Sequence, residues 1–310
     1  MSKVRWWRGE TMKILWKDKF KEKDKIVYWI REWFESEVQV GENNDYVMAS
    51  KILPEINVDD VSKKALVNIT GGKDSAIVAA LCVEALGKNR VVGVIAYEPT
   101  SNHDALRRAR KVVDILGIEH YSFDISSIVN TYRAAFTTSI ARSHTILYPE
   151  AYRKLPKHII NSILYTIAAQ DMSANVACCQ NASELYIGYN TKFGDLAGDF
   201  APLADIPSTL VTDIGRAIAY TVPELSDIIE NDPVIGVDKV TGENTFGFGY
   251  EELDNYLFNI EGIISETGIE KIKLMHKLAK SKARLAIPKY KAVIKDSVDE
   301  ENQIIYAETT

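Results

Sequence analysis

Apolar residues along the chain fall into short continuous runs and into faces with helical spacing. The short runs predict strands at 66–69, 91–96, 120–125 and 175–179. Apolar residues three or four positions apart predict helices at 24–38, 74–86, 103–116, 151–172, 213–231 and 250–286. Strands that alternate with helices at this spacing are typical of parallel sheets with crossover helices. We therefore expect an α/β fold in one compact domain, with a parallel sheet flanked by helices.

Composition narrows the class of protein. The chain is 46% hydrophobic and 26% charged, which is ordinary for a soluble globular protein. Its net charge of −6 gives no basic surface for nucleic acid, and no apolar run is long enough to span a membrane. The cysteines Cys82, Cys178 and Cys179 lack the spacing of a metal site or a secreted disulfide framework. These features predict a cytoplasmic protein that binds neither membranes nor nucleic acid.

The most informative segment is the turn between the first predicted strand and its helix. It reads Leu-Val-Asn-Ile-Thr-Gly-Gly-Lys-Asp-Ser over residues 66–75. Paired glycines allow a tight turn with close backbone approach to a ligand, and the helix start adds free N–H donors. Hydroxyls, a cation and a carboxylate complete the set, so we expect pyrophosphate to bind Thr70, Gly71, Gly72, Lys73, Asp74 and Ser75. An ordinary Gly-Gly turn remains the alternative.

The common phosphate-loop and dinucleotide-loop patterns do not match this turn. Instead it resembles the [ST]-G-G-x-D-S loop of the N-type ATP pyrophosphatases. The resemblance implies their fold, the Rossmann-like three-layer sandwich also called adenine nucleotide alpha hydrolase-like. It also implies their chemistry, in which ATP is split between its α and β phosphates and AMP is transferred to an oxygen of the substrate.

A second motif follows the fourth predicted strand. Residues 191–203, Thr-Lys-Phe-Gly-Asp-Leu-Ala-Gly-Asp-Phe-Ala-Pro-Leu, resemble the T-K-[FY]-G-D-x-x-x-D-x-x-P-L signature of ammonia-dependent NAD synthetases. Residues 243–254 and, more weakly, 281–288 are similar to later motifs of the same family. Taken without the first motif, the Asp/Gly/Lys cluster would be read as a solvated loop.

The family resemblance implies a complete reaction. ATP adenylates the nicotinate carboxylate of deamido-NAD, pyrophosphate leaves, and ammonia displaces AMP to give NAD. By position, Asp74 and Glu184 match the family's Mg²⁺ ligands, and Asp74, Lys192, Asp195 and Asp199 its catalytic residues. The resemblance also assigns the binding of deamido-NAD to Lys192, Asp195, Asp199 and Lys282. A homodimer is implied, with an extension at 1–23, the synthetase domain at 24–295 and a tail at 296–310.

This chain departs from the family pattern in four places, and each departure weakens the groups that would offset the negative charge of the ligands. The region of the family's N-x-x-x-R motif contains no arginine here, although Lys157 or Asn161 could substitute. A Gly-Thr pair becomes Cys178-Cys179, a lysine becomes Ser208, and the tail histidine and lysine become Lys282 and Ala283. We therefore expect a divergent family member.

Two other classes of function stay open at this point. One is another N-type ATP pyrophosphatase, either amide-forming or RNA-thiolating, but the chain shows neither a basic RNA-binding face nor a catalytic cysteine spacing. The other is a non-catalytic nucleotide-binding relative, which the four departures would suit. Neither alternative changes the expected fold.

Overall fold

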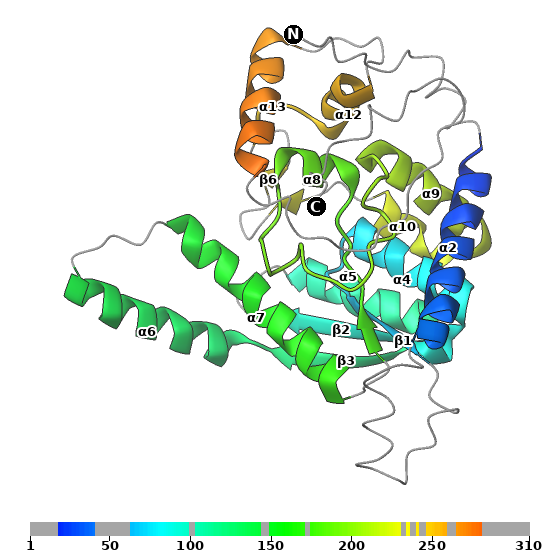
Figure 1. Ribbon diagram of the computed structural model, residues 1–310, viewed down its shortest axis with the longest axis horizontal. Coiled ribbons are helices and arrows are strands. Elements are labelled where there is room, and N and C mark those ends of the chain that lie inside the picture. Colours follow the sequence, from blue (N-terminus) through cyan, green and yellow to red (C-terminus); the bar gives the residue numbers. More distant parts are fainter. Residues whose placement is uncertain are drawn as a thin grey trace.

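A parallel sheet forms the centre of the protein (Figure 1). The computed structural model describes residues 18–40, 63–98, 103–143, 149–170, 174–230, 234–235, 240–241, 246–258 and 265–280. The sheet has the order β3-β2-β1-β4, with β3 at Glu119–Asp124, β2 at Val91–Tyr97, β1 at Lys64–Asn68 and β4 at Ala174–Val176. Every neighbouring pair is parallel. The expected α/β architecture is therefore confirmed.

Successive residues of β1 face opposite sides of the sheet, so both of its faces are buried. Ala65 and Val67 pack into the larger core with α2 (Lys19–Val40), α4 (Lys73–Leu86), α5 (His103–Leu116) and α9 (Ser208–Thr221). Leu66 packs on the other side against Leu164 of α7 (Pro149–Gln170). Helices on both faces make three layers, as is usual when strands are parallel.

Two predicted helical stretches are each divided into separate helices. The stretch 213–231 contains the end of α9, the 3-10 turn η3 (Pro223–Leu225) and α10 (Ser226–Ile229), because Pro223 has no N–H to continue α9. The stretch 250–286 contains α12 (Tyr250–Phe258) and α13 (Glu266–Ala279), and the Ser265 side chain caps α13 by accepting from Gly268 N. Residues 281–286 lie outside the described part.

Other elements were not predicted from the sequence. They are η2 (Lys88–Arg90), α6 (Ser126–Ser143), α8 (Ala182–Ile187) and the antiparallel pair β5 (Val234–Ile235) and β6 (Val240–Thr241). Helix α6 and the first half of α7 project together from the body as a two-helix arm (Figure 1). Exposed Tyr132 and Phe136 lie on α6, so the arm carries apolar surface. Among the described helices, none combines the length and hydropathy needed to cross a membrane.

The order of the strands places two loops side by side. The chain leaves β1 for β2 on one side of it, and returns to β4 on the other side. In open parallel sheets, ligands bind at such a switch point, beyond the carboxyl ends of the strands. Residues 69–72 after β1 and 177–181 after β4 therefore meet there, and both segments contribute to one cavity.

Candidate active site

The turn after β1 is held in shape by its own hydroxyls. Thr70 Oγ1 and Ser75 Oγ lie 3.0 Å apart, and Gly72 N donates to Thr70 Oγ1 at 3.2 Å. Gly71 has a φ of +80°, and a Cβ there would lie 2.1 Å from the Ala105 carbonyl oxygen of α5. Only glycine fits this position, because of both its backbone conformation and this close approach.

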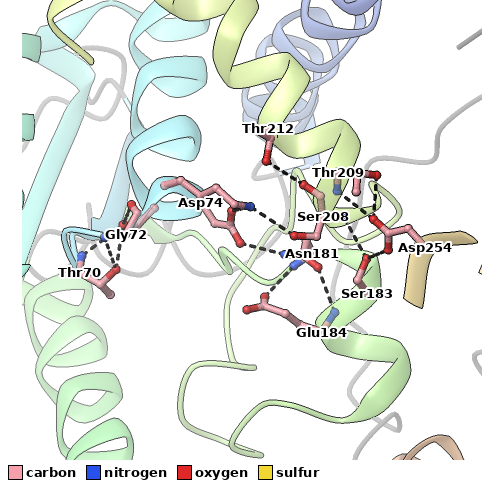
Figure 2. Close-up of polar contacts among 12 residues, drawn as sticks. Thr70, Gly72, Asp74, Asn181, Ser183, Glu184, Ser208, Thr209, Thr212 and Asp254 are labelled. Carbon is pink, nitrogen blue, oxygen red and sulfur yellow. Dashed lines mark hydrogen bonds and ion pairs between the residues drawn. The ribbon is translucent and has the colours of Figure 1, made fainter. Parts of the chain in front are cut away.

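Asn181 links the two predicted metal ligands (Figure 2). Its side-chain Nδ2 donates to Asp74 Oδ2 at 2.8 Å, and its Oδ1 accepts from Glu184 N at 3.0 Å. In return, Glu184 Oε2 accepts from Asn181 N at 3.2 Å, which completes a capping box at the start of α8. The short helix α8 thus holds Glu184 beside the start of α4.

The local electrostatics fit a bound divalent cation. Burial and, after it, the negative charge of Asp74 raise the pKa of Glu184 to about 8. Lys73, whose Nζ lies 2.8 Å from Asp74 Oδ1, offsets only part of the negative charge of two carboxylates, and Mg²⁺ would supply the rest. Within the described ranges, no group of three or more His, Cys, Asp or Glu side chains is arranged to hold a metal ion. Mg²⁺ is typically bound by one or two carboxylates together with phosphate oxygens and water. Asp74 and Glu184 therefore suit that ion.

A buried carboxylate fastens α8 and α9 together (Figure 2). Asp254 of α12 accepts from Thr209 N at 2.9 Å and from Thr209 Oγ1 at 2.8 Å. It also accepts from Ser183 Oγ, which in turn accepts from Ser208 N at 2.9 Å. Asp254 is 1% exposed, and burial raises its pKa. This network fixes the first residues of α9 at the edge of the site.

A cavity of about 400 Å³ opens between these elements. The loop residues Thr70 to Ser75, together with Glu184 and Asp195, line it. Across from the loop, Lys157 of α7 pairs with Asp195, with 2.5 Å between Nζ and Oδ2. Thr191 N donates to Asp195 Oδ1 at 2.5 Å. The charged lining residues are three acids and three bases, namely Asp74, Glu184, Asp195, Lys73, Arg108 and Lys157.

Two predicted substrate residues, Lys192 and Asp199, do not line the cavity, and a third falls outside the described residues. Asp199 accepts from Val176 N at 2.7 Å and from Tyr165 Oη at 3.3 Å, so its carboxylate fastens the loop to β4. Lys192 lies outside the cavity lining, with its Nζ 5.2 Å from the Phe193 ring centroid. Lys282 lies outside the described residues. The roles of these three in binding deamido-NAD stay predictions.

The cysteine pair that replaces the family's Gly-Thr is divided between the core and the cavity. Cys178 is 2% exposed in the core, whereas Cys179 lines the cavity. Burial raises the pKa of the Cys179 thiol, which keeps it protonated at neutral pH. At the position of the family's threonine, the cavity wall therefore carries a weak hydrogen-bond donor.

Sequence reasoning missed several residues of this site. Asn181 could have been found, because Asn-x-x-Glu is the signature of a helix capping box. Arg108, whose Nε donates to the Gly71 carbonyl oxygen at 2.8 Å, and Tyr250, which also lines the cavity, gave no local signal. Only the fold brings them to the loop.

The fold and the site together define a class: a parallel α/β protein with a glycine loop and a cavity lined by charged residues at the carboxyl edge of its sheet. Two solved structures share this fold. An NMN synthetase from Francisella tularensis has a TM-score of 0.68 at 24% identity, and an NH3-dependent NAD synthetase from Campylobacter jejuni has 0.62 at 22%. Each likeness covers 87% of this chain and 97% of the other. The chain therefore shares the fold of these two synthetases.

The sequence relatives define the family. Residues 49–291 match the pattern of the NAD synthase family, so the chain belongs to that family. An NH(3)-dependent NAD(+) synthetase of Methanococcus aeolicus is 33% identical over 201 residues, 64% of this chain and 76% of the relative. The protein of the same name from Methanococcoides burtonii is 33% identical over 212 residues, 68% of this chain and 75% of the relative.

Proposed function

We propose that this protein is a ligase that amidates deamido-NAD with ammonia at the expense of ATP, giving NAD, AMP and pyrophosphate. The observation that carries the proposal is the joint placement of Asp74 and Glu184, bridged by Asn181, beside the glycine loop. Relatives named NH(3)-dependent NAD(+) synthetase support it independently. A carboxylate is a poor electrophile and must gain a leaving group before an amine can displace it.

In the first half of the reaction, adenylation, the loop after β1 binds the phosphates of ATP. Backbone N–H groups at the start of α4 and the side chains of Thr70, Lys73 and Ser75 bind the β and γ phosphates. Asp74 and Glu184 hold Mg²⁺, which when bound neutralises charge on the departing pyrophosphate. The nicotinate oxygen attacks the α phosphorus, and the bond to the β-phosphate oxygen breaks. The products of this step are an acyl-adenylate and pyrophosphate.

In the second half of the reaction, amidation, the residues on the opposite wall of the cavity bind and deprotonate ammonium. Asp195 attracts ammonium and accepts the proton that it must lose before its nitrogen can attack the acyl carbon. As the C–N bond forms, the bond from that carbon to the AMP oxygen breaks, AMP leaves, and the nitrogen releases a second proton. Lys157 and Thr191 N orient the Asp195 carboxylate for this role. Asp199 acts as a positioning residue through its bond to β4. Lys192 binds deamido-NAD, an assignment that rests on the resemblance.

The assembly and location of the enzyme are further parts of the proposal. A two-fold homodimer is supported by the apolar surface of the arm, where Tyr132 and Phe136 are exposed. Free Cys82, Cys178 and Cys179 support a reducing cytoplasm. The net charge of −6 supports small-molecule substrates over nucleic acid.

The decisive test is a product assay with purified full-length protein. The protein is incubated with ATP, Mg²⁺, ammonium and either deamido-NAD or nicotinate mononucleotide, because one similar structure is an NMN synthetase. We expect NAD and AMP to appear in equal amounts from deamido-NAD. AMP with amidated mononucleotide alone would reassign the substrate. AMP with neither product would point to another acceptor, and ATP binding without AMP formation would point to a non-catalytic relative.

A further inference from the structure

Lys73 spans the gap between the first residues of two helices. It begins α4, and its Nζ lies 2.8 Å from Asp74 Oδ1 and 3.3 Å from Ser208 Oγ at the start of α9. The Lys73 side chain is only 10% exposed. All three residues line the cavity. The ammonium group is therefore held inside the site, between the glycine loop and α9.

The two helix starts differ in what they offer an anion. In the described part of the chain, the backbone N–H groups of Lys73, Asp74 and Ser75 donate to no acceptor, so they are free for a ligand. At α9, Ser208 N donates to Ser183 Oγ and Thr209 N to Asp254 Oδ2. Because Asp254 is a carboxylate, it also offsets the positive end of the α9 dipole. Helix α9 therefore adds little attraction for phosphate.

We propose that Lys73 supplies from α4 the positive charge that a lysine at position 208 would supply from α9. The inference rests on the proposed function and assigns Lys73 to the β and γ phosphates of ATP. The family pattern has lysine at position 208, where this chain has Ser208. The contact between Lys73 Nζ and Ser208 Oγ shows that an ammonium group based on either helix start could reach this part of the cavity. The charge has moved from α9 to α4 rather than been lost.

The pairing explains why serine suits position 208. A short hydroxyl leaves room for the Lys73 side chain and accepts one of its three N–H donors. A second lysine at 208 would place two ammonium groups near one point. Without Lys73, Asp74 would lose its ion-pair partner, and the phosphates would face backbone donors, the hydroxyls of Thr70 and Ser75, and Arg108.

The test transfers the charge back to α9 and measures binding by calorimetry. We compare Lys73→Gln, the double variant Lys73→Gln/Ser208→Lys, and a control, Lys73→Gln/Ser208→Gln, that adds length without charge. The ligands are ATP, pyrophosphate and AMP, each with Mg²⁺. We expect Lys73→Gln to weaken ATP and pyrophosphate binding about tenfold, because a charge-assisted contact is lost, and AMP binding less than about twofold. Ser208→Lys in the double variant should restore most of the loss, and Ser208→Gln should not.

Each other outcome overturns the inference. Equal weakening of AMP and pyrophosphate would show that Lys73 only supports the structure, and failure of Ser208→Lys to restore binding would show that the two positions are not equivalent. If Lys73→Gln does not fold, Lys73→Met replaces it in the same series, because it keeps the packing of the alkyl stem. Binding is measured without amidation, so a failed product assay would contradict the proposed function alone.

Discussion

Asn181 donates a 2.8 Å hydrogen bond from its side-chain amide to Asp74, and so joins the loop after β4 to the loop after β1. The same side chain caps α8 through Glu184 N. One residue therefore sets both the position of Glu184 and the orientation of the Asp74 carboxylate. Because the two functions use different atoms of the amide, substitutions can separate them.

Asn181→Ser and Asn181→Ala form a matched pair for this purpose. Serine keeps a capping oxygen but has no Nδ2 for Asp74, whereas alanine loses both bonds. We expect Asn181→Ala to lower the free energy of unfolding by about 1 kcal/mol and Asn181→Ser by only a few tenths. Both should lower kcat, because Asp74 loses its orienting donor. Normal turnover of Asn181→Ser would show that the bond to Asp74 has no role in catalysis.

Removing either proposed metal ligand should stop turnover without unfolding the protein. In Asp74→Asn or Glu184→Gln the charge disappears but the shape is kept, so we expect kcat to fall roughly a hundredfold or more. Thermal unfolding should show intact folds. A partial recovery of the rate at high Mg²⁺ is expected, because affinity for the ion is reduced. Near-normal rates at ordinary Mg²⁺ would make the metal assignment wrong.

The two glycines of the loop should respond differently to alanine. Gly71→Ala places a Cβ 2.1 Å from the Ala105 carbonyl oxygen at a φ of +80°, so we expect a loss of about 1–3 kcal/mol in the free energy of unfolding. Gly72→Ala is the control, because its φ of −91° suits alanine and its nearest neighbour is the Thr70 hydroxyl at 3.3 Å. Denaturant unfolding of both variants measures the difference. Equal stability would contradict the close approach of α5 to the loop.

The sheet could be predicted because its strands are short continuous apolar runs. The strands at β1, β2, β3 and β4 and the glycine loop between β1 and α4 all carry local signals, and the family resemblance was confirmed by the match over residues 49–291. Helix α6 was missed because Val129 is buried, whereas Ile128, Tyr132 and Phe136 are exposed. Its apolar side chains therefore do not form the single buried face that a local pattern detects.

The site was predicted where a motif names adjacent residues, and missed where distant segments meet. Asp195 was expected near the ligand and does line the cavity, but its partner Lys157 comes from α7, a distant segment of the chain. Asp199 belongs to the same motif, and its carboxylate is bonded to β4. Spacing alone could not distinguish these two aspartates, because the difference lies in which segment each one faces.

An exposed ion-pair network should give a small stabilisation that depends on pH. Arg216 Nε and Nη2 donate to the Glu230 carboxylate at 2.7 and 2.9 Å, joining α9 to the end of α10. The hydrogen bond from Arg216 lowers the pKa of Glu230 below its usual 4.5. The stabilisation is therefore present above pH 4.5 and is lost as the pH falls through the lowered pKa. Because both side chains are 47% exposed, we expect Glu230→Gln to cost only about 0.2–1 kcal/mol at pH 7.

Comparing the unfolding of wild type and Glu230→Gln at several pH values checks this prediction. The difference between them should shrink below pH 4 and stay constant from pH 6 to 8. It should also shrink at high salt, because the pair is exposed. A difference that grew on acidification would contradict the direction of the pKa shift.

Lys157 should determine the affinity for deamido-NAD in place of the family's arginine. It lines the cavity and pairs with Asp195 over 2.5 Å, so Lys157→Gln removes a cation and leaves the carboxylate without its ion-pair partner. We expect KM for deamido-NAD to rise about tenfold, with little change in KM for ATP, because the charge-assisted contacts lie on the α7 side of the cavity. Lys157→Arg should keep most of the affinity, since the charge remains. Lys154→Gln is the control, because it removes the same charge from α7 outside the cavity lining. A loss of ATP affinity in Lys157→Gln as large as the loss for deamido-NAD would place Lys157 at the phosphate site instead.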